Sequence, residues 1–215
     1  MFDLSFQVKK AEVLPHAAAP CMNFKLAISS ASEKHSIRGM SVQCQIRIEP
    51  TRRRYTVDEQ AHLRELFGAP ERWSQTLRSV LWTHATVSVP AFSGSIEVDL
   101  PVPCTSDFAF GAAKYFYGLD EGTVPLILLF SGSVFYSSLE GMPGMQISPI
   151  PWDKETSFQL PVNLWKEMMA AYYPNSSFLS LQKDVFDRLY EYRTRNGLTS
   201  WESTLDSLLQ PGRNA

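Results

Sequence analysis

Apolar and polar residues alternate almost without error along residues 2–9, 40–49 and 96–102. A period of two places the apolar side chains on one face of an extended strand and the polar side chains on the other. Strands of this kind form antiparallel sheets that pack one face on a core and turn the other face to solvent. The pattern therefore predicts sheets, but it does not indicate a function.

Further segments bring the number of predicted strands to about eight. Asp120-Glu121-Gly122 separates two of them, and a short glycine-containing loop between strand-like segments indicates a hairpin. In that hairpin Tyr115-Phe116-Tyr117 would carry aromatic rings on both faces of a strand, so one face would need cover from helices or from a partner. The predicted strands are residues 2–14, 22–28, 37–49, 85–89, 95–102, 107–119, 123–136 and 146–149.

Between residues 56 and 81 the spacing of apolar residues changes to that of a helix. Thr56 and Glu59 have the spacing of a capping box, in which each side chain bonds to the other residue's backbone N–H. Leu63 and Phe67 would lie on the inner face of a first short helix, and Trp73 would begin the inner face of a second. Residues 56–81 are therefore predicted to form a helical insertion between strands.

The C-terminal third is predicted to be helical. Three helices follow from these start and stop signals: Pro161 and Pro174, Ser180 and Asn196-Gly197, and a second capping box of Thr199 and Glu202. Residues 211–215 are interpreted as a frayed tail.

These elements predict an α+β fold. Residues 1–150 would form an antiparallel β-sandwich of the immunoglobulin-like kind, with the helical insertion at 56–81. The helices of residues 151–210 would pack on the sandwich as part of the same structural unit, since an uncovered sheet edge invites aggregation. The alternative is a smaller antiparallel sheet with all helices on one side.

Composition narrows the class of protein. The chain has 215 residues, 44% of them hydrophobic and 20% charged, which is the ordinary composition of a globular protein with a substantial core. The net charge of −2 argues against a general nucleic-acid binder. The longest apolar run, residues 124–130, is too short for a membrane-spanning helix, and the N-terminus lacks the pattern of a signal peptide. Three cysteines without a C-x-x-C pair favour the reducing cytoplasm.

No motif for catalysis, metal binding or cofactor binding stands out, so no such residue is predicted. The cysteines and His16, His35 and His84 lack the closely spaced ligand pair of zinc and iron–sulfur sites. Neither a G-x-S-x-G sequence nor a phosphate-binding glycine loop occurs. An enzyme would need a site assembled from dispersed residues, for which His84, Asp107 and Asp153 are the candidates.

Two segments are candidates for contact with a partner. Arg52, Arg53 and Arg54 lie between a strand and the helical insertion, where they form either a patch for an anionic partner or a solvated turn. Trp152 and Asp153 follow a loop rich in glycine and proline. There the tryptophan either anchors an interface or fills a gap between sheet and helices.

Several short segments of the sequence together carry a resemblance. They are CQIRIEPTRRRY at 44–55, LWTH at 81–84, LPVPCT at 100–105, VPL and FSG within 124–132, and PWDKE at 151–155. The chain resembles, over nearly its whole length, an uncharacterised bacterial family, a domain of unknown function of about this size. The resemblance implies an association with gene clusters of actinobacterial-type uptake nickel–iron hydrogenases. It transfers no functional residue.

The expected function is therefore that of a non-enzymatic accessory or scaffolding protein that acts through protein–protein contacts. The resemblance implies hydrogenase subunits or maturation factors as partners, in assembly or maturation of a hydrogenase system. Neither nucleic acid nor membrane insertion is expected. The alternative is a carrier or binding module for a small ligand or a metal centre, with the sandwich interior or the junction of sheet and helices as its pocket.

Overall fold

The computed structural model describes residues 3–31, 35–104, 110–138 and 144–209. The chain divides into two compact units, Met1–Pro174 and Asn175–Ala215. Each unit is described by itself below. Asp107, residues 141–143 of the predicted Gly/Pro-rich loop and the predicted tail at 211–215 lie outside the described residues.

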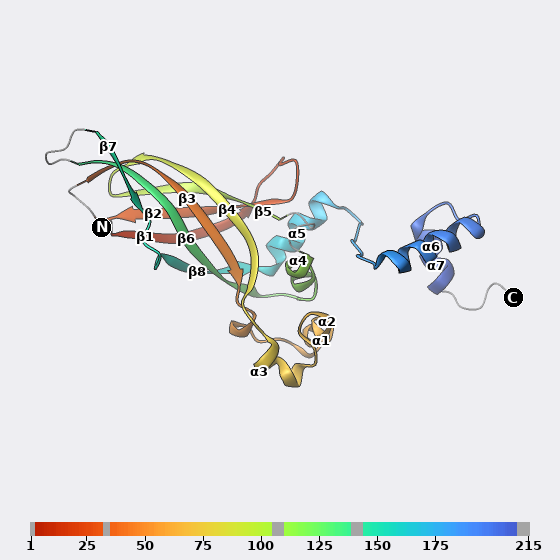
Figure 1. Ribbon diagram of the computed structural model, residues 1–215. Coiled ribbons are helices and arrows are strands. Elements are labelled where there is room, and N and C mark those ends of the chain that lie inside the picture. Colours follow the sequence, from red (N-terminus) through yellow and green to blue (C-terminus); the bar gives the residue numbers. More distant parts are fainter. Residues whose placement is uncertain (1–2, 32–34, 105–109, 139–143, 210–215) are drawn as a thin grey trace. The chain divides into compact units, whose positions relative to one another are not determined.

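Two antiparallel sheets form the first unit, so the predicted α+β class with about eight strands is confirmed. The immunoglobulin-like strand order is not confirmed. One sheet has the order β1-β2-β5, and the other has the order β4-β3-β6-β7 with β8 also paired to β6 (Figure 1). The strands are β1 (Leu4–Val13), β2 (Cys21–Ser30), β3 (His35–Ile48), β4 (Val80–Phe92), β5 (Ser95–Pro103), β6 (Thr123–Ser138), β7 (Met145–Pro149) and β8 (Glu155–Pro161).

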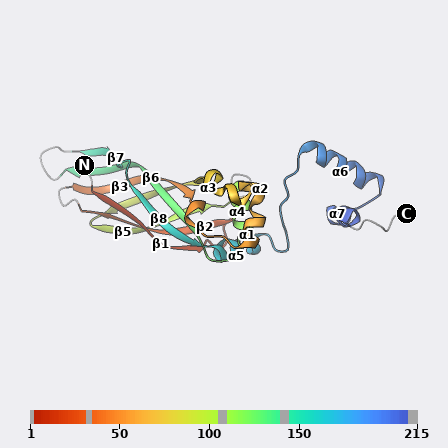
Figure 2. The same ribbon diagram turned by 90° about the horizontal axis from the view of Figure 1, so that it is seen from below.

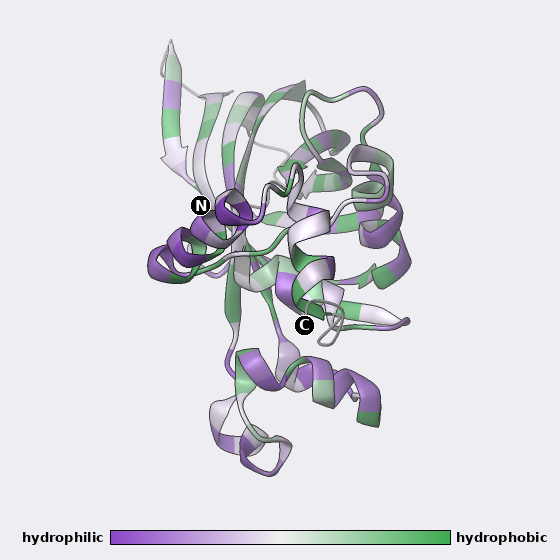
Figure 3. Cartoon of the chain, turned by 90° about the vertical axis from the view of Figure 1, so that its right-hand side faces the viewer, coloured by the Kyte–Doolittle hydropathy of each residue, from purple (hydrophilic) through white to green (hydrophobic). Residues whose placement is uncertain are grey.

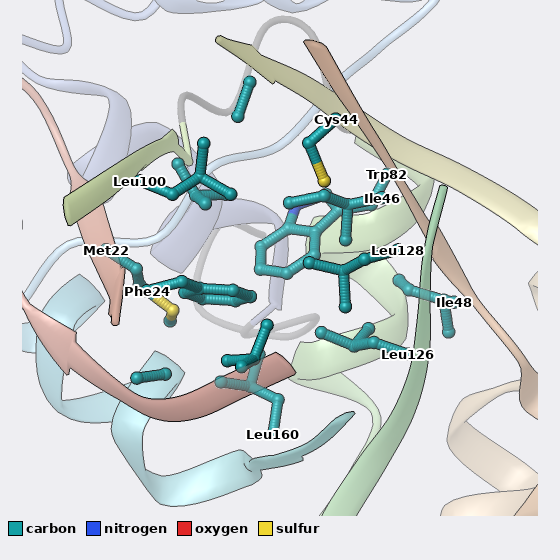
Figure 4. Close-up of a cluster of buried hydrophobic side chains, with 14 of the residues drawn as sticks. Met22, Phe24, Cys44, Ile46, Ile48, Trp82, Leu100, Leu126, Leu128 and Leu160 are labelled. Atoms are coloured by element: carbon teal, nitrogen blue, oxygen red, sulfur yellow. The ribbon is translucent and has the colours of Figure 1, made fainter. Parts of the chain in front are cut away.

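A shared hydrophobic core joins the two sheets. Phe6 of β1 stacks on Phe130 of β6 with ring centroids 4.4 Å apart, and Phe24 of β2 meets Phe158 of β8 at 5.6 Å. Figure 4 shows side chains of β2 and β5 facing those of β3 and β6 across this core. The alternating sequence pattern predicted such a core. In Figure 3, bands of hydrophobic and hydrophilic residues alternate along the strands.

The predicted helical insertion is confirmed, with shifted ends. Its elements are η1 (Pro50–Arg52), α1 (Val57–His62), α2 (Arg64–Phe67), η2 (Pro70–Arg72) and α3 (Trp73–Thr76). The capping box is present: the Glu59 N–H donates to Thr56 Oγ1 over 3.1 Å, and the Thr56 N–H donates to Glu59 Oε2 over 3.0 Å. Val80, predicted to continue the second helix, instead begins β4.

The prediction of a strand at 107–119 was wrong. Phe110–Tyr117 forms the helix α4, so Asp120-Glu121-Gly122 connects a helix to β6 rather than two strands. Ala112, Tyr115, Phe116 and Leu119 are buried, and their spacing is that of one helical face. Aromatic residues favour strands by propensity, but here this buried stripe decides the structure.

The prediction that residues 151–210 are helical was wrong for β8. This strand pairs with residues 123–129 of β6, and its alternating Phe158 and Leu160 face the core. The helix expected after Pro161 is present as α5 (Val162–Tyr172), which buries Trp165 and Met168. The predicted short edge strand near 146–149 is confirmed as β7.

Strand β6 has two partners placed end to end along one of its edges. β8 pairs with residues 123–129 and β7 with residues 133–137, and the chain turns between them at 150–154. Gly132 lies at the change of partner with a φ of 131°, and a Cβ there would collide with the Ser41 carbonyl oxygen. Only glycine fits this close approach of two backbones.

The helices of the first unit gather at one end of the sheets. Figures 1 and 2 both show α1–α3, α4 and α5 at the end where β3 leaves its sheet. Aromatic side chains from all three groups meet there, since Tyr115 of α4 contacts Phe67 and Phe116 of α4 stacks on Trp165 of α5 at 5.1 Å.

The second unit contains α6 (Lys183–Arg195) and α7 (Trp201–Leu209). Helix α6 ends at Asn196 followed by Gly197 with a φ of 61°, as predicted. The N-cap of α7 is Ser200, one residue after the predicted Thr199. Its Oγ accepts the Ser203 N–H over 3.1 Å. The two helices meet through Phe186 and Trp201, whose ring centroids lie 5.3 Å apart. That these helices pack on the sandwich stays a prediction.

Candidate functional site

The three consecutive arginines divide into two kinds. Arg53 is 10% exposed and forms a 2.6 Å ion pair with Glu59, which is 1% exposed. Arg53 also donates to the backbone carbonyls of Glu121 and Thr123, so it ties the helical insertion to the start of β6. Arg52 and Arg54 are exposed. Of the predicted contact residues at this junction, these two are on the surface and Arg53 is committed to the fold.

The buried carboxylate of Glu59 is compensated from several sides. Burial raises the pKa of Glu59, but hydrogen bonds from the backbone N–H groups of Asp120 and Thr56 and from Arg53 outweigh burial and lower that pKa below its usual value. Glu59 is therefore an ionised structural group. Among the described residues, Arg53 Nε is a buried side-chain nitrogen without a hydrogen-bond partner.

Trp152 is 91% exposed, so the interpretation that it fills a gap between sheet and helices was wrong. It lies with the exposed Asp153 in the turn between β7 and β8. Hydrogen bonds fix both sides of this turn: the Ile150 N–H donates to the Gly132 carbonyl and the Phe130 N–H donates to the Lys154 carbonyl, each over 2.9 Å. The alternative interpretation, that Trp152 anchors an interface, stays a prediction.

The structure does not bring the two predicted contact segments together. The arginine junction is bonded to residue 123 of β6, whereas the Trp152 turn is bonded to residues 130 and 132. Seven to nine residues of strand at about 3.3 Å each separate them by roughly 25 Å. They are two separate surfaces, bonded to β6 at different points along the strand.

The dispersed enzyme candidates do not converge among the described residues. His84 is exposed on β4, and the register runs from His84 to Gln45, then to Leu129 and Glu155. Three strand spacings of about 4.8 Å therefore separate His84 from the strand that follows Asp153. Asp107 lies outside the described residues.

Cys21 and Cys104 lie near each other where β2 pairs with β5, but they form no metal-ligand group with other described side chains. Among the described residues, no three His, Cys, Asp or Glu side chains group closely enough to hold a metal ion. All three cysteines are free, and burial raises the pKa of Cys44 and of Cys104 to about 12. These two thiols are protonated at neutral pH and pack as small apolar groups.

An aromatic cluster at the helical end of the sheets was missed by sequence reasoning. Its members come from distant segments: Tyr55, Phe67, Trp73, Trp82, Tyr115, Phe116 and Trp165. The hydroxyls of Tyr55 and Tyr115 are 2.8 Å apart, and the Tyr55 hydroxyl donates to the Pro50 carbonyl. Burial raises the pKa of both tyrosines, so they stay neutral. Trp73, Trp82 and Trp165 were visible in the sequence as a signal of buried aromatic residues. Which rings they contact depends on the fold.

A cavity of about 150 Å³ opens beside this cluster. Its lining is formed by Ile48, Leu66, Phe67, Val80, Gly111 and Tyr115. The predicted alternative of a pocket at the junction of sheet and helices names the same region.

The second unit presents its apolar side chains on its surface. Thr204 is the only buried residue among residues 175–209. Eight large apolar side chains there are between 39% and 76% exposed: Phe178, Leu179, Leu181, Phe186, Tyr190, Leu205, Leu208 and Leu209.

Comparison with known families identifies the chain at its full length. Residues 1–215 match DUF6084, which is described as a family of unknown function. The chain belongs to this family. The predicted membership of a domain of unknown function is thereby confirmed, while the association with hydrogenases stays a prediction.

Other comparisons add little to this membership. No curated protein matches the chain. Among solved structures, β-glucosidase 3B from Thermotoga neapolitana in complex with α-D-glucose aligns with 74% of this chain and 17% of its own chain, at 12% identity and a TM-score of 0.26. This likeness carries no argument. No described helix is both long and apolar enough to span a membrane.

Proposed function

We propose that this member of DUF6084 is a non-enzymatic accessory protein of the cytoplasm that acts through protein–protein contacts. The observation that carries the proposal is the second unit, in which Thr204 is the only buried residue among residues 175–209. A unit of this size without an apolar core does not supply its own stability. Covering one exposed leucine contributes about 1.5–3 kcal/mol, so a partner surface gains from binding these helices.

The partners proposed are hydrogenase subunits or maturation factors. The support is the resemblance of residues 44–55, 81–84 and 151–155 to a family for which an association with uptake nickel–iron hydrogenases is predicted. An accessory role in assembly or maturation needs a surface that binds a protein rather than a catalytic centre. The apolar helices of the second unit have that character, since their exposed leucines offer contact area without chemistry.

Two further surfaces of the first unit belong to the proposal. Arg52 and Arg54 are exposed and offer guanidinium groups for carboxylates of a partner. Trp152, with Asp153 beside it, is 91% exposed on an ordered turn. Contacts made by the arginines weaken with salt, whereas contacts made by the leucines and the tryptophan do not.

The experiment is purification of the tagged full chain from its native cells at low and at high salt, with partners identified by mass spectrometry. The test variant is Leu208→Asp with Leu209→Asp, and the matched control is Thr199→Asp, which adds charge at an exposed polar position of the same unit. Hydrogenase subunits or maturation factors should be recovered with the control at both salt concentrations and be lost with the double variant.

Two results would contradict the proposal. Recovery of the same partners with the double variant would exclude the apolar helices as the contact. Recovery of no hydrogenase protein with the unmodified chain would exclude the proposed partners. A third result would assign the contact to the arginine junction. In that case partners would be lost at high salt only, and Arg52→Glu with Arg54→Glu would abolish their recovery at low salt.

A further inference from the structure

The cavity beside the aromatic cluster lies where the helical insertion, α4 and the second sheet meet. Ile48 closes it from β3 and Val80 from β4, while Phe67 of α2 and Tyr115 of α4 supply aromatic rings. Ile48, Phe67 and Tyr115 are themselves buried, so their positions are fixed by the core. Leu66 and Val80 are half-buried and Gly111 is exposed, so the cavity has a buried floor and opens to solvent beside α4.

Gly111 lies at the mouth of this cavity and is exposed. It is the second residue of α4. A Cβ at Gly111 would meet nothing within 4 Å, and its φ is not in the left-handed region. Neither crowding nor backbone conformation requires a glycine at this position.

Gly118, at the other end of the same helix, shows the contrast. A Cβ there would come within 2.8 Å of Leu63 Cδ2, so packing of the helical insertion demands glycine. At the exposed Gly111 a Cβ would meet open space instead. The absence of a side chain there leaves the mouth of the cavity uncovered.

The described side chains of the lining offer water few hydrogen-bonding partners. A buried water makes about three hydrogen bonds to protein groups. The polar side-chain group at this cavity is the Tyr115 hydroxyl, and it is already bonded to the Tyr55 hydroxyl. Because Tyr55 donates its proton to the Pro50 carbonyl, Tyr115 donates to Tyr55 and keeps only acceptor capacity.

We infer that the cavity is a binding site for a small apolar molecule the size of a single aromatic ring. Cavities of about 150 Å³ lined by leucine, isoleucine and phenylalanine bind benzene, and the volume and lining here are of that kind. The rings of Phe67 and Tyr115 offer edges and faces to an aromatic guest. The site is independent of the contacts proposed for the second unit.

The test uses benzene as the probe on the full chain. Titration is followed by two-dimensional ¹H–¹⁵N NMR and by the thermal midpoint, which rises when a ligand binds only the folded state. Amide signals near Gly111 and Phe67 should shift in a saturable manner. Gly111→Leu places a side chain at the mouth of the cavity and should weaken benzene binding by about tenfold or more. Val80→Phe fills the cavity from the opposite wall and should do the same.

The control is Tyr117→Leu, which introduces the same side chain into α4 at a position that is 67% exposed and away from the cavity. It should bind benzene like the unmodified chain. If Gly111→Leu fails to fold, as judged by circular dichroism, Gly111→Ala replaces it, since its Cβ has no clash. Absence of saturable shifts in the unmodified chain, or unchanged binding in both filled variants, would overturn the inference and leave the proposed protein contacts untouched.

Discussion

Residues 1–174 and 175–209 use the same kinds of apolar side chain in opposite ways. In the first unit Phe24, Phe116 and Leu128 are fully buried, and both sheets contribute to one core. In the second unit Phe186, Leu208 and Leu209 are 43%, 45% and 76% exposed. The first unit is stabilised by its own packing, whereas the large apolar side chains of the second unit are on its surface. The difference teaches that the first unit has a core of its own, whereas the described large apolar side chains of the second lack full cover within their unit.

The largest expected effect comes from removing matched rings in the two units. Phe116→Ala removes a fully buried ring that stacks on Trp165, and it should lower the free energy of unfolding by about 3–5 kcal/mol. Phe186→Ala should lower it by less than about 1 kcal/mol, because that ring is 43% exposed. Urea denaturation of both variants measures the two values. Equal losses would mean that α6 and α7 have a core of their own.

A somewhat smaller loss is expected from the buried ion pair of the first unit. Arg53→Ala leaves the Glu59 carboxylate buried without its cationic partner and should cost about 3 kcal/mol. Lys183→Ala breaks the Lys183–Asp187 pair of the second unit, whose side chains are 86% and 54% exposed, and should cost at most about 0.5 kcal/mol. Chemical denaturation at neutral pH compares them. A cost for Arg53→Ala as small as that of the control would refute the structural role of Arg53.

The dependence of stability on acid pH should report on the same buried pair, Arg53 and Glu59. The pKa of Glu59 is lower in the folded chain than its ordinary value of 4.5, so the unfolded chain binds the proton more tightly. Its stabilising contribution is complete above pH 4.5 and is lost as the pH falls through the lower, folded pKa. The free energy of unfolding should therefore fall below pH 4.5, and Glu59→Gln should reduce that slope. An unchanged slope in Glu59→Gln would assign the acid sensitivity to other carboxyls.

The smallest effect on stability is expected at Trp152. This ring is 91% exposed, so Trp152→Ala should change the thermal midpoint little, by the equivalent of about 0.5 kcal/mol or less. Calorimetry measures that change, and the purification described above measures recovery of partners. If the Trp152→Ala variant is stable but recovers less partner, the ring serves partner binding and not the stability of the first unit. A large loss of stability would show that the ring packs in solution.

The strands were predictable where burial follows a simple period. The apolar positions of β3, from Met40 to Ile48, are buried in strict alternation. Helix α4 was mistaken for a strand because Tyr115-Phe116-Tyr117 has high strand propensity, while its helical stripe spans only two turns. Strand β8 was missed because it lies between prolines at 151 and 161 beside helical sequence.

The candidate sites were predictable only as surface segments. The run of arginines was visible in the sequence, but the burial of Arg53 depends on the loop at 121–123, which is far away along the chain. The cavity joins residues from 48 to 115, and no local pattern contains that information. Exposure of Trp152 required knowledge of the turn that the paired strands impose on residues 150–154.

The division of β6 between two partners has a consequence for solubility. A sixteen-residue strand with a bare edge would be a template for intermolecular strand pairing and hence for aggregation. Here β8 occupies one stretch of that edge and β7 another, and the ordered turn at 150–154 bridges the gap beside Gly132. Pro149 and Pro161 end the two short strands and lack the N–H groups needed to extend the ladder. The longest strand of the molecule is thereby protected from recruiting further copies of the chain.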